Sequence, residues 1–398
     1  MQSNGEFNLL MVAGERSGDL YGGRLAACLK ARLPAMEIFG CGGDMMRQGG
    51  VDTIVDSQQF AMVGITEVIS GLPRAWRALN RLVNAARERQ PRLAVLIDSP
   101  SLNMRLAKRL KRLGIPVLYF ISPQIWAWKK WRLRQLPSLV DRMVCIFDFE
   151  EGIYRRAGIL VDYVGHPLVD TVRPRVSREE FFSQAGLDPY TRTVALLPGS
   201  REIEVAYILP TLVEAAARLW EGRKIQCIIA VAPALNVSRM EERVRRGRPA
   251  KLKLVANATY DALAYSDVAV VASGTATVEA ALLERPMVVV YRVSPITAFF
   301  ARWMVSVPFY SMVNILAGHQ VVEELIQGDF TPSRVVASVE ELLDHPSTAL
   351  KTELRNVKQR LGTGGAIERA AEVVERMVLE PGVSAPPDIA DATALGDN

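Results

Sequence analysis

The sequence predicts an α/β protein made of two doubly wound units, each a parallel sheet covered by helices. Short β-branched runs alternate with longer amphipathic stretches along most of the 398 residues, a pattern typical of strands joined by crossover helices. The alternation pauses near Pro167 and Pro174 and then restarts. A chain of this length is too long for one ordinary core and suits two domains.

The first unit carries strand and helix signals in regular alternation. We expect strands near residues 9–13, 38–40, 93–98, 117–121, 143–147 and 163–165, and helices near residues 22–32, 73–89 and 102–113. After the break we expect strands near residues 194–197, 226–231, 253–255, 268–272 and 287–291. Because right-handed crossovers join parallel strands, each set predicts a parallel sheet whose carboxyl edge carries ligand-binding loops.

The predicted domain boundaries follow this alternation. Residues 1–172 are expected to form an N-terminal lobe, and residues 173–345 are expected to form a second lobe. The helices of residues 346–380 are expected to pack back across the lobes. The tail, residues 381–398, is rich in Pro, Ala and Asp and is expected to be disordered. The ligand cleft should lie between the lobes.

Composition excludes several classes of function. The four cysteines lie far apart without a CxxC pair, and the three histidines have no paired spacing, so we expect neither a disulfide framework nor a metal site. We expect no signal peptide, and no stretch reaches the roughly 18–20 apolar residues of a membrane span.

One stretch of the first unit is strongly basic. Residues 71–134 hold fifteen Lys and Arg against two acids, Glu88 and Asp98. Such a surface either faces water or meets anionic lipids or phosphorylated ligands. Nucleic acid is not expected, because no recognition motif accompanies the charge.

Two loops of the first unit carry candidate acceptor-side residues. In the loop GERSGD, after the first strand, Glu15 and Asp19 would repel a pyrophosphate, so a carboxylate-lined acceptor loop is favoured over a dinucleotide site. The alternative is a tight turn with Asp19 as a cap. Asp98 closes an apolar strand whose carboxyl end should face the cleft. Its alternative is a helix N-cap, a role that Ser99 or Ser101 could fill instead.

Two loops of the second unit place small residues at a helix start. The first ends in Ser200 and Arg201, which can hold a diphosphate through amides and a charge-assisted fork. The second, ASGTATVE, also suits phosphate binding, with ordinary helix capping as the alternative. Its Glu279 lies one turn further on and could reach a pair of ribose hydroxyls.

Two aromatic segments suggest contact with a membrane. Trp126 and Trp128 interleave with Lys and Arg, a pattern of interfacial segments, and aromatic core packing is the alternative. Phe299, Phe300 and Trp303 lie in a stretch with few charges. If exposed, they would form a membrane or acyl-chain site. If buried, they would belong to the core or to a dimer interface.

Together these motifs resemble the lipid-A-disaccharide synthase family. The matching stretches are GERSGDLYGGRL, MVGITEV, IDSPSLNMRLAK, SPQIWAWKKWR, VGHPL, LLPGSREIEV, ASGTATVEAALLERPMVV and NILAGHQVVEELIQ. The resemblance implies a GT-B fold of two Rossmann-like lobes. It implies inverting transfer of 2,3-diacylglucosamine from its UDP conjugate to 2,3-diacylglucosamine 1-phosphate, giving the β-1,6-linked lipid A disaccharide 1-phosphate and UDP. It implies no metal or other cofactor and a place at the inner face of the inner membrane.

Carried over motif by motif, the resemblance implies that Asp98 is the catalytic carboxylate. It implies that residues 1–172 are the acceptor and membrane lobe, with an acceptor side lined by Glu15, Ser17 and Asp19, and that residues 173–345 are the UDP-sugar donor lobe. The implied donor-side residues are Ser200, Arg201, Ser273, Gly274, Thr275, Glu279, Asn314, Glu324 and Gln327. The expected partners are the UDP-diacylglucosamine donor, the acylated glucosamine 1-phosphate acceptor and an anionic membrane surface, with a homodimer as an open option.

Two other functions stay open on the same sequence. A UDP-N-acetylglucosamine 2-epimerase-like GT-B enzyme acts on a soluble substrate and would not need the apolar segment. A non-catalytic membrane lipid-binding module would not need the two phosphate-type loops.

Overall fold

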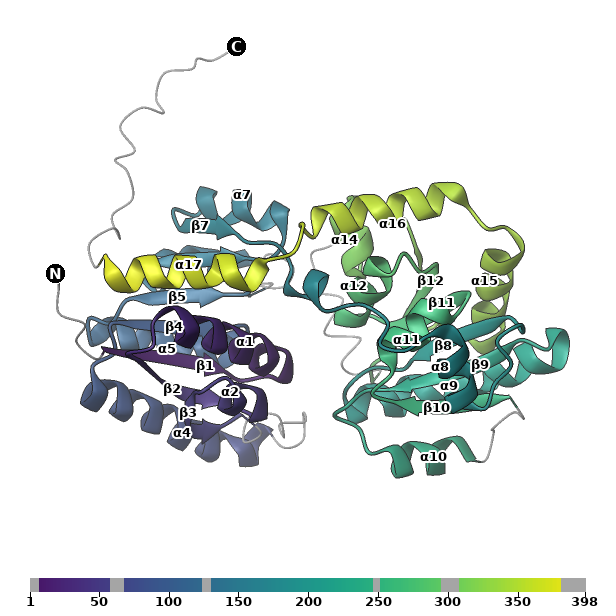
Figure 1. Cartoon of the computed structure of the whole chain (residues 1–398), viewed down its shortest axis with the longest axis horizontal. Helices are drawn as coiled ribbons and strands as arrows, with labels where there is room; N and C mark the ends of the chain where they lie inside the picture. Colours follow the sequence, from purple (N-terminus) through teal and green to yellow (C-terminus); the bar gives the residue numbers. More distant parts are fainter. Residues whose placement is uncertain (1–6, 58–67, 124–129, 246–250, 295–307, 381–398) are drawn as a thin grey trace, which may run out of the picture. The chain divides into compact units, whose positions relative to one another are not determined.

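The computed structural model describes residues 7–57, 68–123, 130–245, 251–294 and 308–380, without the side chains of residues 68–72 and 130–132. These residues divide into two compact units (Figure 1). The first unit runs to Pro167 and resumes at Leu361, and the second is Leu168–Arg360. The chain therefore enters the second unit once and returns to the first for its last helix.

The first unit holds, in its described residues, a seven-stranded sheet in the order β3-β2-β1-β4-β5-β6-β7, with every neighbouring pair parallel. The central strands are wholly apolar because helices cover both faces of such a sheet. The strands are β1 Phe7–Ala13, β2 Met36–Gly42, β3 Asp52–Asp56, β4 Leu93–Ile97, β5 Val117–Phe120, β6 Arg142–Cys145 and β7 Leu160–Tyr163. The helices are α1 Arg16–Arg32, α2 Asp44–Gln48, α4 Val68–Arg89, α5 Pro100–Arg112, η1 Lys130–Ser138, α7 Asp148–Arg156 and α17 Ala366–Leu379.

The second unit holds, where the structure describes it, a six-stranded parallel sheet in the order β10-β9-β8-β11-β12-β13. The 3₁₀ helix η2, Pro167–Asp170, leads into it. The strands are β8 Thr193–Leu197, β9 Gln226–Val231, β10 Leu252–Ala256, β11 Val268–Ala272, β12 Met287–Tyr291 and β13 Glu323–Ile326. The helices are α8 Arg178–Ala185, α9 Glu202–Arg223, α10 Val237–Arg245, α11 Thr259–Tyr265, α12 Thr275–Leu282, α14 Met312–Ala317, α15 Pro332–Asp344 and α16 Thr348–Arg360.

Each sheet has one point where its strand order reverses, between β1 and β4 in the first sheet and between β8 and β11 in the second. Ala13 of β1 pairs with Ile97 of β4, and Leu197 of β8 pairs with Val271 of β11. At such a point the loops that follow the two strands diverge and leave room for a ligand. All four loops predicted to carry chemistry start at these two points.

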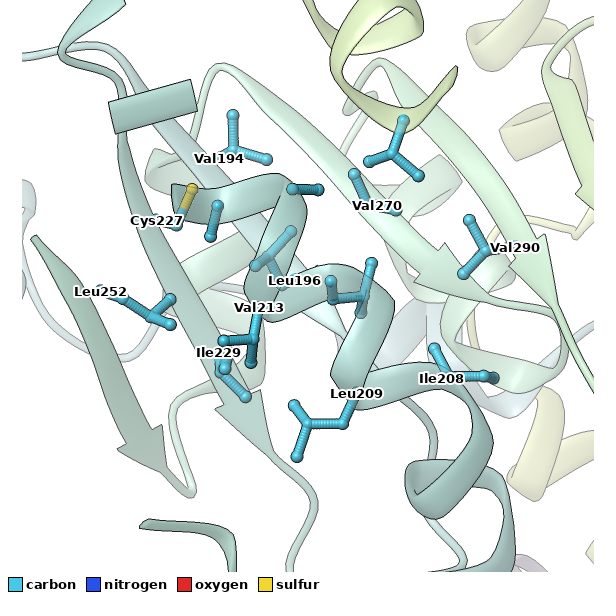
Figure 2. Close-up of a cluster of buried hydrophobic side chains, with 14 of the residues drawn as sticks. Val194, Leu196, Ile208, Leu209, Val213, Cys227, Ile229, Leu252, Val270 and Val290 are labelled. Carbon is cyan, nitrogen blue, oxygen red and sulfur yellow. The ribbon is translucent and has the colours of Figure 1, made fainter. Parts of the chain in front are cut away.

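The core of the second unit fixes the start of α9 at this edge. Ile208, Leu209 and Val213 of α9 belong to one buried cluster with Leu196 of β8 and Ile229 of β9 (Figure 2). Burial of these apolar side chains is the main force that holds the helix on the sheet. The first turn of α9 therefore follows directly from the loop at the end of β8.

The last two helices belong to different units. α16 packs against α12 and α14 in the second unit, whereas α17 packs against α1 and β4 in the first (Figure 1). An ion pair of 2.7 Å joins Arg32 of α1 to Glu375 of α17. The first unit is therefore completed by the C-terminal part of the described chain.

The predicted fold class is confirmed, since both sheets are parallel and doubly wound. Two strands lie outside the predicted set, β3 and β13. Both are edge strands that contain acidic residues, so their apolar signal is short. The strand predicted at residues 163–165 is placed too late in the chain, because β7 ends at Tyr163 and Gly165 has a φ of +80°.

Candidate functional site

The structure brings the two acceptor-side loops of the first unit together. A Cβ atom on Gly14, in the loop after β1, would lie only 2.9 Å from the Oγ atom of Ser99, in the turn after β4. Glu15 follows Gly14 and is exposed, Ser17 is half-buried in the first turn of α1, and Asp98 is half-buried. This edge of the first sheet therefore carries acidic and hydroxyl groups side by side.

Asp98 is the first residue after β4 and is not the N-cap residue of the next helix. The N-cap position of α5 belongs to Ser99, whose side chain makes no capping hydrogen bond. The capping alternative for Asp98 is therefore wrong. Both residues have left-handed backbone, with φ of +49° and +43°. A strained backbone at a strand end is a recurrent feature of functional sites.

Asp19 has a different environment from the one predicted for an acceptor-lining residue. It is 7% exposed, and its carboxylate accepts hydrogen bonds from the backbone N–H groups of Gly43 (2.6 Å), Met45 (3.2 Å) and Met46 (3.1 Å). These amides form the start of α2, where a negative charge is stabilised. Asp19 therefore holds α2 in place, and its oxygens are already engaged.

The loop after β8 also differs from the prediction. Its Ser200 and Arg201 amides donate to the Oε2 atom of Glu204, at 3.2 and 3.3 Å. The Arg201 guanidinium donates to Glu204 Oε1 at 2.9 Å, although 65% of the Arg201 side chain is exposed. A carboxylate of the chain itself thus occupies the donors expected to hold a diphosphate.

The start of α9 nevertheless keeps anion-binding capacity. Arg201 is the N-cap residue of this helix, and its side chain makes no capping bond. It cannot make one, because a guanidinium has no acceptor atom. The N-cap side chain therefore does not occupy the first amides of α9, and these amides point out of the helix, as in many phosphate sites.

The loop after β11 presents a second helix start. Gly274, with φ of +146°, is the N-cap residue of α12 and is exposed, as is Thr275. The alternative that Ser273 or Thr275 caps the helix is wrong, because α12 has no side-chain cap. Ser273 instead donates from Oγ to the carbonyl of Tyr310 at 2.7 Å. The exposed start of α12 thus lies at the same switch point as that of α9.

Glu279 lies one turn into α12 and is half-buried. Burial raises its pKa to about 7, and a hydrogen bond with Tyr260 of α11 acts in the opposite direction. The carboxyl group is therefore close to half protonated at neutral pH. A partner that donates hydrogen bonds to it would favour the charged form.

Asn314 and Glu324 form a rigid connection between α14 and β13. The Asn314 amide donates to Val322 O (2.9 Å) and Glu324 Oε1 (2.8 Å), and its oxygen accepts from the amides of Val321 and Val322 (2.8 and 2.9 Å). All four hydrogen-bonding positions of this buried side chain are thus filled. The structure therefore assigns Asn314 a scaffolding contact in place of the predicted ligand contact.

Glu324 is engaged in the same way. Its Oε1 also accepts from the amide of Ser311, and its Oε2 accepts from the amide of Tyr310, both at 2.9 Å. Gln327 follows β13 with φ of +53°, and its amide donates to the carbonyl of Tyr291 at 2.9 Å. The side chain of Gln327 is half-buried at the edge of the sheet.

The sequence prediction missed two residues at this edge. Glu204 stands three positions after the N-cap residue Arg201, which is the spacing of a capping box and could have revealed it. Tyr291 ends β12, and burial and the charge of Glu204 raise its pKa, against the influence of Arg201. No local motif marks Tyr291, because only the sheet order brings β12 beside β11.

The residues predicted to touch a membrane lie outside the described part of the chain. These are Trp126, Trp128, Phe299, Phe300 and Trp303. Within the described part, α4 exposes Trp76 (59%) between Arg74 and Arg77, which are also exposed. Among the helices that the structure describes, none is long and apolar enough to cross a membrane.

The described residues contain no group of three His, Cys, Asp or Glu side chains arranged to hold a metal ion. His166 is buried against the rings of Phe147 and Tyr21, at centroid distances of 5.4 and 6.4 Å. Burial lowers its pKa to about 3, so it is neutral at physiological pH. Its environment is that of a packed core side chain.

Comparison with solved structures supports the fold. A UDP-GlcNAc 2-epimerase from Neisseria meningitidis bound to UDP-GlcNAc matches with a TM-score of 0.62 at 12% identity, over 93% of this chain and 100% of that one. MurG from Acinetobacter baumannii matches with a TM-score of 0.57 at 12% identity, over 94% and 100%. The chain therefore has the fold shared by GT-B glycosyltransferases and these epimerases.

Sequence comparison is more specific. The family model of lipid-A-disaccharide synthetase matches residues 9–378. The lipid-A-disaccharide synthase of Syntrophus aciditrophicus is 43% identical over 366 residues, which is 91% of this chain and 96% of that protein. The synthase of Myxococcus xanthus is 44% identical over 377 residues, or 94% and 98%. On this nearly full-length similarity, the chain is a transferase that belongs to the lipid-A-disaccharide synthase family.

Proposed function

We propose that this transferase condenses UDP-2,3-diacylglucosamine with 2,3-diacylglucosamine 1-phosphate and inverts the anomeric centre. The observation that carries the proposal is the pair of switch-point edges. One presents Asp98, and the other presents Arg201 and the starts of α9 and α12, neither of which is capped by its N-cap side chain. An α-linked donor and a β-1,6-linked product require one in-line displacement. Such a reaction needs a base near the acceptor and positive groups near the leaving UDP.

Asp98 acts as the base in this proposal. The acceptor 6-hydroxyl oxygen forms a bond to the anomeric carbon of the donor while its proton passes to the Asp98 carboxylate. The bond from the anomeric carbon to UDP breaks, and the electron pair leaves on the β-phosphate oxygen. Glu15 and Ser17, on the adjoining loop, hold acceptor hydroxyls, and Asp19 fixes the neighbouring helix start.

Arg201 and the helix starts stabilise the departing diphosphate. In the free chain Glu204 holds the guanidinium of Arg201, and the diphosphate takes over that contact when the donor binds. A diphosphate carries more negative charge than a carboxylate, and its oxygens match the guanidinium fork. Gly274 and Thr275 supply further amides at the start of α12, while Glu279 and Gln327 bind the nucleoside.

The proposal also places the chain at an anionic membrane on the cytoplasmic side of the inner membrane. The exposed Trp76 and its flanking arginines on α4 provide one attachment surface. Replacing Phe299, Phe300 and Trp303 together with Ser should lower recovery with phosphatidylglycerol vesicles. Tyr190→Ser, at a tyrosine that is 95% exposed, is the matched control and should bind as the parent does. Equal recovery of the triple variant would place its aromatic residues in the core or a dimer contact.

Incubation with both acylated substrates tests the proposal. Mass spectrometry should detect UDP and a disaccharide phosphate, and proton NMR should show a β-linkage. A UDP-sugar isomer formed without acceptor would support the epimerase alternative. Binding of the lipids without release of UDP would support the carrier alternative. Addition of EDTA should leave the rate unchanged, because Arg201 and backbone amides supply the positive charge.

A further inference from the structure

We propose that Tyr119 and Asn103 are positioning residues that fix the direction of the Asp98 carboxylate. This inference rests on the proposed role of Asp98 as base. Tyr119 belongs to β5, the strand next to β4, and Asn103 lies in the first turns of α5. Both side chains are fully buried beside the turn that contains Asp98.

The backbone of this turn is strained at two successive residues. Asp98 and Ser99 are the only consecutive non-glycine residues with positive φ in the described part of the chain, at +49° and +43°. This conformation is disfavoured for L-residues because the Cβ atom approaches the following carbonyl oxygen. Two such residues in succession persist only when their surroundings hold them.

Two buried donors hold the turn at one atom. The Tyr119 hydroxyl and the Asn103 amide both donate to the carbonyl oxygen of Asp98, the latter at 2.8 Å. The same amide donates to the carbonyl of Ile97 at 2.9 Å. Because the Asp98 carbonyl belongs to the peptide between Asp98 and Ser99, these bonds fix ψ of the first residue and φ of the second. They thereby fix the direction in which the Asp98 side chain leaves the backbone.

Two buried polar atoms in and beside this turn have no hydrogen-bond partner. Ser99 Oγ and Asn103 Oδ1 are buried without a partner, and they are two of three such side-chain atoms in the described residues. Ser99 also stands at an N-cap and makes no cap bond. An N-cap residue with extended backbone would satisfy an amide of the helix. The observed geometry therefore forgoes helix stabilisation and keeps Asp98 in a defined direction.

The test is a double-mutant cycle in which one variant removes a donor that holds the turn and the other relieves the strain that this donor opposes. Tyr119→Phe removes one donor and should lower kcat about tenfold, since the loss of one buried hydrogen bond is of that order. The affinity for UDP should not change. Ser99→Gly removes the penalty for positive φ at that position. In the Ser99→Gly background, Tyr119→Phe should therefore cost at least about threefold less in kcat.

Gln90→Gly is the matched control. Gln90 has the same φ of +43°, lies in the same unit and is exposed at the end of α4. Glycine there should raise the melting temperature in the same way and leave the kcat cost of Tyr119→Phe unchanged. A general stability effect of Tyr119 would respond equally to both glycine backgrounds. An equal kcat cost of Tyr119→Phe in all three backgrounds would overturn the proposal.

Two further variants separate the possible failures. Asn103→Ala in the same backgrounds gives an independent measurement through the second donor, and the same dependence on Ser99→Gly is expected. Asp98→Asn is assayed alongside. Near-parental turnover of Asp98→Asn would remove the base itself and with it the proposed function. A large loss in Asp98→Asn without any effect of background at Tyr119 and Asn103 would remove only the positioning role.

Discussion

The two switch-point edges of the molecule prepare their functional groups in opposite ways. At the edge of the first sheet, Asp98 sits in a strained turn whose carbonyl is held by two buried donors. At the edge of the second, Arg201 is mostly exposed and paired with Glu204. A proton-transfer group gains from a fixed direction, whereas a phosphate-binding group can exchange one anion for another. On the proposed roles, the fixed turn holds the base that accepts the acceptor proton, and the exposed ion pair is exchanged when the diphosphate binds.

The largest expected effect concerns the rigid edge. Asp98→Asn should lower kcat by about 10²–10⁴-fold, the usual contribution of a general base. The fold should be preserved, because the side chain is only half-buried and the turn is held through its carbonyl. Initial rates with saturating donor and acceptor measure this. A large loss in Glu15→Gln with near-parental turnover of Asp98→Asn would transfer the role to Glu15.

A variant at the edge of the second sheet should weaken binding of the UDP-sugar donor. Arg201→Ala should raise the KM for the UDP-sugar by about 10–100-fold, because a charge-assisted hydrogen bond contributes on the order of 1.5–3 kcal/mol. Arg218→Ala is the control, since Arg218 lies on the same helix and also pairs with a glutamate one turn away, Glu214, at 2.6 Å. An unchanged KM in Arg201→Ala, or an equal rise in both variants, would move the diphosphate away from this loop.

Glu279 should make stability depend on pH. Its pKa is raised to about 7 in the folded chain from 4.5, so folding favours its protonated form. The contribution is fully present below about pH 4.5 and is lost as pH rises toward 7. Glu279→Gln cannot titrate at this position. Between pH 4.5 and pH 7.5, the free energy of unfolding of the parent should therefore fall by about 1–3 kcal/mol more than that of the variant. Parallel pH profiles of parent and variant in denaturant titrations would contradict a raised pKa.

The smallest predicted effect has the opposite sign from that of Arg201→Ala. Glu204→Gln removes the negative charge that competes with the diphosphate but keeps an oxygen that can accept from the Ser200 and Arg201 amides. UDP should bind about two- to fivefold tighter, because an ion pair whose arginine is largely exposed contributes little. Competition of UDP against the donor measures the change. Weaker binding would show that Glu204 supports the loop and does not compete with the ligand.

Most of the fold could be predicted because its signals are local. The central strands of both sheets are continuous apolar runs, such as β4 and β11, and the loops predicted to carry chemistry follow such strands directly. The edge strands β3 and β13 escaped prediction because acidic residues break their apolar runs. Their identity as strands depends on pairing with β2 and β12, which the local pattern does not contain.

The sequence predicted where the candidate site residues lie in the fold, but not which groups they contact. The motifs put Asp98 and Arg201 at strand ends, and the switch points account for why those ends matter. Asp19 and Asn314 carry the residue types expected of ligand contacts, yet backbone amides of other segments already fill their oxygens. Such partners lie elsewhere in the chain, so only the folded structure distinguishes a scaffolding side chain from a binding one.

The division of labour between the two edges is tested most directly by titrating UDP into Asp98→Asn and Arg201→Ala by calorimetry in the same buffer. Groups that act on different parts of the reaction should have separable effects. Asp98→Asn should bind UDP within about twofold of the parent, and Arg201→Ala should bind it about tenfold or more weakly. Equal weakening of UDP binding in the two variants would contradict the account, because the first edge would then hold the nucleotide as well.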